Sequence, residues 1–212
     1  MIDVSRKEVY RYLGYGYQIP DAVIQKRVEE AICQFESCQP RHVVREFDLK
    51  IHENRIEFES LCIQSRDLLK NLKGCTKVVC MATTLGRFPD HLIQRANIVN
   101  KADAVIFQAV GAAMIEAYTD HINAQIKEEA LKRGYYCHPR YSCGYGDFDL
   151  GYQKDFIRIL DMPKTIGVTL TEGNLMVPYK SITALIGLSK ETMEKSENSC
   201  AACSQKDCIY KK

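Results

Sequence analysis

The feature that most constrains the fold is the order of helical and strand-like hydrophobic patterns along the 212 residues. The longest pattern is helical, roughly residues 104–133, with Gly134 at its end. Strand patterns precede and follow it, at residues 43–51, 56–58 and 77–83 and again at 165–187. Because the strands do not alternate strictly with helices, we expect an α+β fold rather than a doubly wound parallel sheet: an antiparallel-rich twisted sheet with flanking helices.

Local signals place the remaining elements. A capping box at residues 5–8, Pro20-Asp21 and Pro89-Asp90 each predict a helix start, and shorter helices are expected at residues 65–72 and 152–160. The segment from His52 to Arg55 predicts a hairpin loop. A second hairpin is expected from residues 165–171 and 175–187, with a turn at residues 172–174.

Composition narrows the class of protein. No linker divides the first 190 residues, so we expect one domain at residues 1–190 and a short cysteine-containing tail at residues 191–212. The net charge of +2 gives no electrostatic reason to expect nucleic acid or an anionic membrane as a partner. No apolar run approaches the roughly 20 residues of a membrane span, and residues 1–8 do not resemble a signal peptide. We therefore expect a cytoplasmic protein whose ten cysteines are thiols.

The most distinctive segment is residues 138–147, His-Pro-Arg-Tyr-Ser-Cys-Gly-Tyr-Gly-Asp. It has no hydrophobic period, so it fits neither a core helix nor an ordinary strand. Gly144 and Gly146 allow close backbone approach to a ligand, and the planar guanidinium of Arg140 suits a carboxylate or phosphate. It lacks both the third glycine of a dinucleotide fingerprint and a phosphate-loop pattern. From residue chemistry alone, the segment predicts a binding loop for a small polar molecule such as an amino-acid derivative.

The segment Arg140-Tyr-Ser-Cys-Gly-Tyr145 resembles the Arg-x-x-x-Gly-Tyr signature of the S-adenosylmethionine-binding activation domain of cobalamin-dependent methionine synthase. Four other segments resemble parts of that family in the same order: Val9-Tyr-Arg-Tyr-Leu-Gly14, Thr84-Leu-Gly86, Glu116-Ala-Tyr-Thr-Asp120 and Leu175-Met-Val-Pro-Tyr-Lys-Ser181. The resemblance covers most of residues 1–190. It implies that S-adenosylmethionine is held by Arg140, Ser142, Gly144 and Tyr145 in the loop, with Glu116 opposite.

The resemblance also implies a function. In that family a partner-bound cobalamin is reduced from Co(II) to Co(I) and then methylated by S-adenosylmethionine. We therefore expect a free-standing relative that serves a corrinoid-binding or methionine synthase-like partner, together with a reductant protein. The work of such a chain is positioning and exclusion of water rather than acid–base catalysis. This agrees with the absence of an obvious Ser/His/Asp, Cys/His or paired-carboxylate constellation in the sequence.

Other interpretations stay open at this stage. The chain could be a non-catalytic module that binds S-adenosylmethionine, a corrinoid protein or a metal, or an ordinary small-molecule methyltransferase, although it lacks a glycine-rich strand-to-helix turn. Within the loop, Arg140 could pair with Asp147 or Asp149. Glu116 and Asp120 could simply belong to the solvated face of the long helix.

The tail contains a second candidate site. Cys200, Cys203 and Cys208 place a Cys-x-x-Cys pair and a third thiol within nine residues. This spacing suits Zn²⁺ or an iron–sulfur cluster, each of which normally takes four ligands. The fourth could be Cys137 or Cys143, another chain or a labile ligand. The alternatives to a metal site are a redox pair and exposed thiols.

Overall fold

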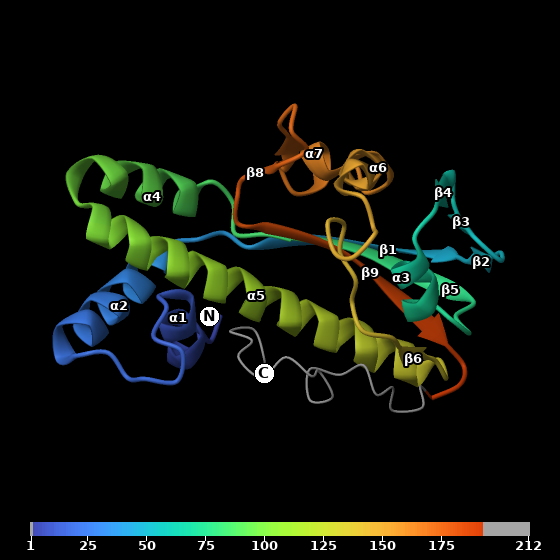
Figure 1. The fold of residues 1–212 in the computed structure, drawn as a ribbon, viewed down its shortest axis with the longest axis horizontal. Helices are drawn as coiled ribbons and strands as arrows, with labels where there is room; N and C mark the ends of the chain where they lie inside the picture. Colours follow the sequence, from blue (N-terminus) through green and yellow to red (C-terminus); the bar gives the residue numbers. More distant parts are fainter. Residues whose placement is uncertain (1, 193–212) are drawn as a thin grey trace.

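The computed structural model describes residues 2–192 and has the expected α+β architecture (Figure 1). Its helices are α1 (Arg6–Tyr12), α2 (Ala22–Phe35), α3 (Arg66–Asn71), α4 (Phe88–Val99), α5 (Lys101–Lys132), the 3-10 turn η1 (Leu150–Tyr152), α6 (Gln153–Ile159) and α7 (Met162–Thr165). Its strands are β1 (Arg41–Asp48), β2 (Lys50–Ile51), β3 (Ile56–Phe58), β4 (Leu61–Ile63), β5 (Lys77–Thr84), β6 (Tyr136–Cys137), β7 (Thr169–Leu170), β8 (Met176–Val177) and β9 (Ser181–Ser189).

The main sheet is antiparallel, with its four strands in the order β1-β5-β9-β6. The two long central strands pair along their whole shared length, from Lys77 opposite Leu188 to Thr84 opposite Ser181. Both are almost completely buried, because helices and loops cover both faces of the sheet. Two small sheets, β2-β3-β4 and β7-β8, lie outside it.

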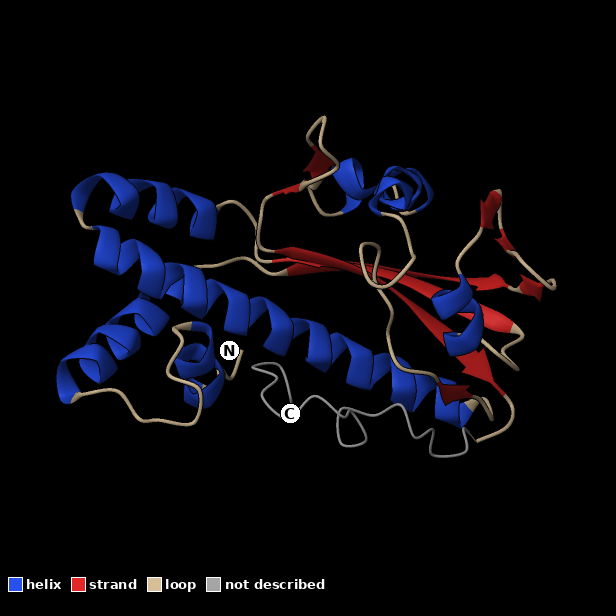
Figure 2. Cartoon of the chain, viewed as in Figure 1, coloured by secondary structure: helices blue, strands red, loops and turns tan. Residues whose placement is uncertain are grey.

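Side chains alternate between the two faces of the sheet, and a separate part of the core covers each face. Figure 2 shows α5 on one face and the shorter helices α6 and α7 on the other. On the α5 side, Val79 and Met81 of β5 pack with Ile122 and Ile126. On the opposite side, β5 packs into a cluster that includes Phe148, Phe156 and Leu160. A third cluster joins α1, α2 and α4 to the N-terminal half of α5.

A buried hydroxyl pair holds α5 against the sheet. The side chain of Thr119 lies 2.7 Å from that of Thr83 on β5, and both residues are fully buried. The Thr119 hydroxyl also bonds the Ile115 carbonyl, 2.7 Å away. Because an unmatched hydroxyl in an apolar layer is costly, this pair favours one axial position of α5 over β5. Glu116 and Asp120 flank Thr119 in sequence, so the same contact fixes where their side chains emerge.

The helix signals in the sequence are confirmed. Ser5, Asp21 and Ser65 are N-caps, and each side chain accepts a hydrogen bond from a backbone N–H three residues on. The expected long helix is α5, and the hairpin loop at residues 52–55 joins β2 to β3. Among residues 2–192, no helix combines the length and hydrophobicity needed to cross a membrane.

The second predicted hairpin was wrong over most of its length. Only Thr169–Leu170 and Met176–Val177 pair with each other, and Thr165, the expected start of the first strand, is the last residue of α7. The chain then turns at a cis peptide bond before Pro178, and Ser181–Ser189 enters the main sheet as a central strand. The hydrophobic run at residues 182–188 is explained by burial on both faces of that sheet, not by a hairpin.

Candidate functional site

The predicted binding loop closes a cavity of about 590 Å³ against α5 and β9. Its lining residues come from four parts of the chain: Glu116 of α5, residues 140–143, 145 and 146 of the loop, Leu150 and Gln153 beyond it, and Met176 with residues 181–183 at the start of β9. Ligand sites of small molecules are typically clefts of about 300–1,000 Å³, so the cavity has a suitable size. The structure brings together Glu116, Arg140, Ser142 and Tyr145 around it, while Gly144 lies in the same loop.

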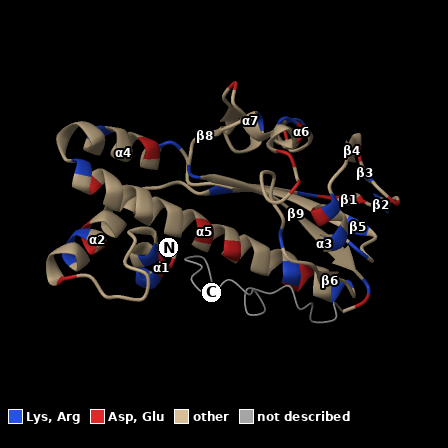
Figure 3. Ribbon diagram, in the orientation of Figure 1, with Lys and Arg blue, Asp and Glu red and all other residues tan. Residues whose placement is uncertain are grey.

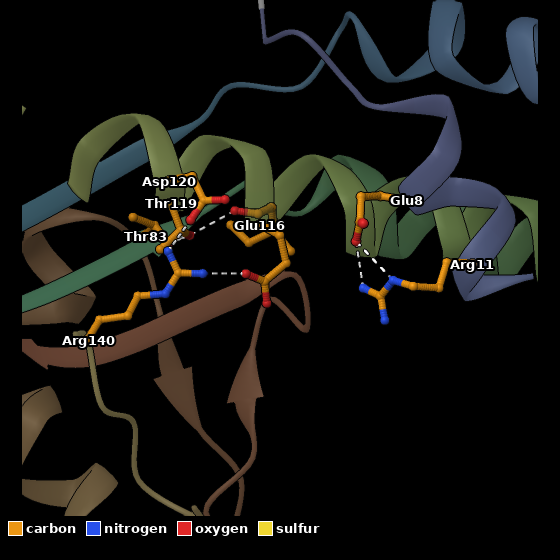
Figure 4. Close-up of polar contacts among 8 residues, drawn as sticks. Glu8, Arg11, Thr83, Glu116, Thr119, Asp120 and Arg140 are labelled. Carbon is orange, nitrogen blue, oxygen red and sulfur yellow. Dashed lines mark hydrogen bonds and ion pairs between the residues drawn. The ribbon is translucent and has the colours of Figure 1, made fainter. Parts of the chain in front are cut away.

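Arg140 extends from the loop to α5 and contacts two carboxylates (Figure 4). One terminal nitrogen of its guanidinium donates to Glu116 Oε2 at 2.6 Å, and the other donates to Asp120 Oδ1. The Arg140 side chain is 22% exposed, whereas those of Glu116 and Asp120 are 42% and 56% exposed. The two acids lie one helical turn apart, on the acidic middle of α5 that Figure 3 shows. The guanidinium therefore joins the loop to the helix across one side of the cavity.

Asp120 was missed as a site residue, because the sequence pattern placed it on the solvated face of the helix. The signal that could have found it is its spacing of four from Glu116, which puts both carboxylates on one face. The alternative partners of Arg140 have other contacts. Asp147 bonds residues at the start of α3, and Asp149 accepts from the Gly151 N–H at 2.6 Å.

The loop backbone is shaped by its glycines and by β9. Gly144 and Gly146 have φ angles of +89° and +54°, a region that side-chain-bearing residues rarely adopt. Tyr141 exchanges two backbone hydrogen bonds with Leu185, each 2.8 Å long. Beyond that bridge, no strand of residues 2–192 pairs with this edge of β9. The alternation along the strand aims the N–H and C=O of Thr183 at the same side as those of Leu185. The start of β9 therefore forms one side of the cavity and presents backbone hydrogen-bonding groups of Thr183 there.

Polar and aromatic groups complete the lining. The Thr183 hydroxyl donates to the Gln153 side-chain oxygen at 2.9 Å, and both residues are buried. Neither was identified from the sequence, where isolated polar residues in apolar segments give little signal. The Tyr145 side chain is 67% exposed at the cavity rim. Burial raises the pKa of the Cys143 thiol to about 12, so Cys143 is a thiol and not a nucleophilic thiolate at neutral pH.

The proposed metal ligands Cys200, Cys203 and Cys208 lie outside the described residues. Within residues 2–192, no group of three or more His, Cys, Asp or Glu side chains is arranged to hold a metal ion. The two loop-region thiols proposed as a fourth ligand, Cys137 and Cys143, are unpaired cysteines in this part of the chain.

Comparisons with known proteins agree with this architecture. The chain matches the family model described as vitamin B12 dependent methionine synthase, activation domain, over residues 75–196, which is more than half of its length. No curated protein matches the sequence. Among solved structures, the fold is similar to the "Crystal Structure of the MetH Reactivation Domain bound to AdoHcy", with a TM-score of 0.65 and 15% identity. That match covers 91% of this chain and 76% of the other. This chain therefore belongs to the family of vitamin B12-dependent methionine synthase activation domains.

Proposed function

We propose that the cavity between the loop, α5 and β9 binds S-adenosylmethionine, and that the protein supports reductive methylation of a cobalamin held by a partner. The observation that carries the proposal is the position of Arg140 at the cavity wall, where it pairs with Glu116, which also lines the cavity, and with Asp120 beside it on α5. The matched family and the crystal structure of a MetH reactivation domain bound to AdoHcy support it. The domain division at residues 1–190 and the tail at 191–212 is part of the same proposal.

The charge pattern fits the amino-acid end of this ligand. A zwitterion carries one carboxylate and one ammonium; the cavity wall offers the guanidinium of Arg140 and the carboxylate of Glu116, and the carboxylate of Asp120 is a second partner of Arg140. When the ligand carboxylate takes one donor edge of Arg140, it releases a protein carboxylate to pair with the ligand ammonium. The number of ion pairs rises while no charge is left without a partner, which limits the desolvation cost. A purely anionic ligand would form only the ion pair with Arg140, and a neutral ligand would form neither ion pair.

The remaining lining suits the adenosyl end. Near Thr183, no strand of residues 2–192 pairs with the cavity-facing edge of β9, so the backbone N–H and C=O of this residue are a donor and an acceptor that a purine can match. Tyr145 supplies a flat ring at the rim, where stacking on an adenine contributes about 1–3 kcal/mol in comparable base–aromatic contacts. The backbone of Gly144 stays accessible since it has no side chain.

In this proposal the chain acts by positioning. S-adenosylmethionine carries an activated sulfonium methyl group, and a Co(I) corrinoid is a strong nucleophile, so no protein acid or base has to act in the transfer. Arg140 and Glu116 would orient the ligand, and the loop would exclude water from it. The electron that forms Co(I) has to come from a separate reductant protein, and the corrinoid from a corrinoid-binding or methionine synthase-like partner.

Two measurements test the proposal. Calorimetry with S-adenosylhomocysteine should show binding in the wild-type protein and in Arg133→Ala, a matched control in which another arginine loses its pair with Glu46, outside the cavity. Binding should be strongly weakened in Arg140→Ala. In the second assay the protein is mixed with a cob(II)alamin-loaded methyltransferase, a reductant and S-adenosylmethionine, and methylcobalamin is followed by absorbance. Methylcobalamin no higher than without the protein would refute the reactivation function, while retained ligand binding would leave a binding module.

The cysteine tail is tested separately. We propose that Cys200, Cys203 and Cys208 hold Zn²⁺ or an iron–sulfur cluster, a proposal that rests on their spacing. Protein purified without oxygen should contain about one zinc per chain, or iron with visible absorption. Loss of that metal from a Cys203→Ser variant would support the assignment. Wild-type protein with neither metal would refute it.

A further inference from the structure

Both ends of helix α3 contact the binding loop. Within the described part of the chain, no residue of α3 lines the cavity. At the N-terminal end, the carboxylate of Asp147 accepts three hydrogen bonds. The donors are the Ser65 hydroxyl at 2.5 Å and the backbone N–H groups of Arg66 and Asp67 at 2.8 and 3.2 Å. The last residue of the loop is therefore tied to the first turn of the helix.

A second set of contacts ties the start of the loop to the other end of α3. The buried ring of His138 lies with its Nδ1 2.5 Å from the backbone oxygen of Asn71, the last residue of the helix. The side-chain amide of Asn71 donates to the Pro139 carbonyl at 3.1 Å. The helix, whose six residues cover about 9 Å, is therefore bonded to both ends of the loop.

The loop also lies close against α3 between these two contacts. At Gly146, a Cβ atom would lie within 3 Å of the Asp67 carboxylate and the Tyr141 hydroxyl, so those side chains would have to move, and the φ of +54° itself favours glycine. On the other side, α3 is anchored in the core through Leu68, which is fully buried, as is Leu72 just beyond the helix. The loop is consequently positioned relative to the core through a helix that does not itself meet the ligand.

We propose that α3 is a brace for the ligand-binding loop, and that Ser65 and Asp147 are positioning residues that act through Arg140 and Tyr145. The proposal rests on the function proposed above, but the contacts between α3 and the loop do not depend on a ligand. When the Asp147 contacts are removed, residues 139–147 keep their attachments at Tyr141 and at the buried Phe148 that follows the loop, and they lose the contact with the first turn of α3. Arg140 and Tyr145 then sample a wider range of positions. In preorganised active sites a displacement near 1 Å can lower the reaction rate about a hundredfold, and we expect the affinity for the ligand to fall for the same geometric reason.

The test compares two carboxylates that lie two residues apart. Asp147→Ala removes the contacts between the end of the loop and the first turn of α3, whereas Asp149→Ala removes a carboxylate that accepts from the Gly151 N–H within the turn to η1. Hydrogen exchange of the backbone amides at residues 139–149, without ligand, should be at least about tenfold faster in Asp147→Ala and unchanged in Asp149→Ala. The dissociation constant for S-adenosylhomocysteine should rise about ten- to a hundredfold in Asp147→Ala alone. Asp147→Asn, which keeps one oxygen acceptor, should restore part of both properties.

The possible outcomes distinguish a failure of the proposed brace from a failure of the proposed ligand-binding function. Wild-type exchange in Asp147→Ala would overturn the brace, and faster exchange with unchanged affinity would overturn its role in binding. If the wild-type protein binds neither S-adenosylhomocysteine nor S-adenosylmethionine, the proposed function fails, and the exchange comparison alone decides whether the brace exists. If Asp147→Ala does not fold, Asp147→Asn and Ser65→Ala carry the same comparison.

Discussion

Replacing Arg140 by alanine should weaken ligand binding more than it weakens the fold. The stability cost is small because the two ion pairs of Arg140 involve carboxylates that are 42% and 56% exposed. Each such pair contributes about 0.2–1 kcal/mol, and the uncompensated repulsion between Glu116 and Asp120, four residues apart, adds about 0.2–0.5 kcal/mol. The total is about 0.6–2.5 kcal/mol, and each kcal/mol lowers the melting temperature of a chain of this size by about 2–4 °C.

The binding cost is larger because the ligand carboxylate loses its charged partner. A hydrogen bond to a charged group contributes about 1.5–3 kcal/mol, which corresponds to about a 10- to 100-fold change in dissociation constant. The loss does not extend to the ligand ammonium, since Glu116 and Asp120 remain available to it. The expected result is therefore a weaker but measurable affinity for S-adenosylhomocysteine.

Adenosine provides the internal control for this experiment. It has the adenosyl group but no amino-acid zwitterion, so its affinity should be nearly the same in the wild-type protein and in Arg140→Ala. Calorimetric titration of both ligands against both proteins gives the ratio of the two effects. If adenosine and S-adenosylhomocysteine lose affinity equally, Arg140 does not contact the amino-acid end, and the charge-exchange argument is incorrect.

Three further predictions follow from the packing and the pKa shifts. Gly187→Ala should lower the free energy of unfolding by about 1–3 kcal/mol in denaturant titrations, because the new Cβ would lie 2.5 Å from the Cys75 sulfur; an unchanged midpoint would contradict this. The Ser65 hydroxyl, followed by two backbone N–H groups, lowers the pKa of the Asp147 carboxyl. Its contribution to loop order should be complete above the ordinary pKa and disappear as the pH falls through the lowered value. The protection of the amides at residues 139–149, measured relative to the exchange of an unstructured chain at the same pH, should therefore fall in acid before the protein unfolds, and the Asp147→Asn variant should not show this step. Alkylation by iodoacetamide at pH 8, followed by mass spectrometry, should modify the exposed Cys62 quickly and the buried Cys143, whose pKa is raised to about 12, only after unfolding; equal rates would contradict the burial of Cys143.

Much of the fold could be predicted because the signals that determine it are local. Helix caps such as Ser5 and Asp21 depend on a few neighbouring residues, and the long helix is marked by inner-face residues such as Ile122 and Ile126 and by Gly134 just beyond its end. The order of strands could not be predicted in the same way. A hydrophobic run such as residues 181–189 is compatible with a hairpin and with a central strand, and only its pairing with β5 and β6 decides between them.

The candidate site shows the same division. The loop with Arg140 and its glycines was identified from composition and from the family resemblance, and Glu116 was assigned opposite it from the resemblance alone. The structure places the two side chains 2.6 Å apart. Asp120, Gln153 and Thr183 were not found, because each is ordinary in its own segment and becomes notable only beside residues distant in sequence. The contacts of α3 with the loop were missed for the same reason, since they join residues about 70 to 80 positions apart.

The position of β9 also has a consequence for synthesis of the protein on the ribosome. The strand β9 pairs with β5 on one side and with β6 on the other, and residues at its start line the cavity. Until residues 181–189 have emerged, the hydrophobic strand β5 has one edge without its native partner, and the loop cannot form its bridge to Leu185. Before that point the nascent chain exposes an unpaired, hydrophobic strand edge. A ribosome-bound chain that ends near residue 175 should therefore aggregate or recruit chaperones more readily than the complete 212-residue chain.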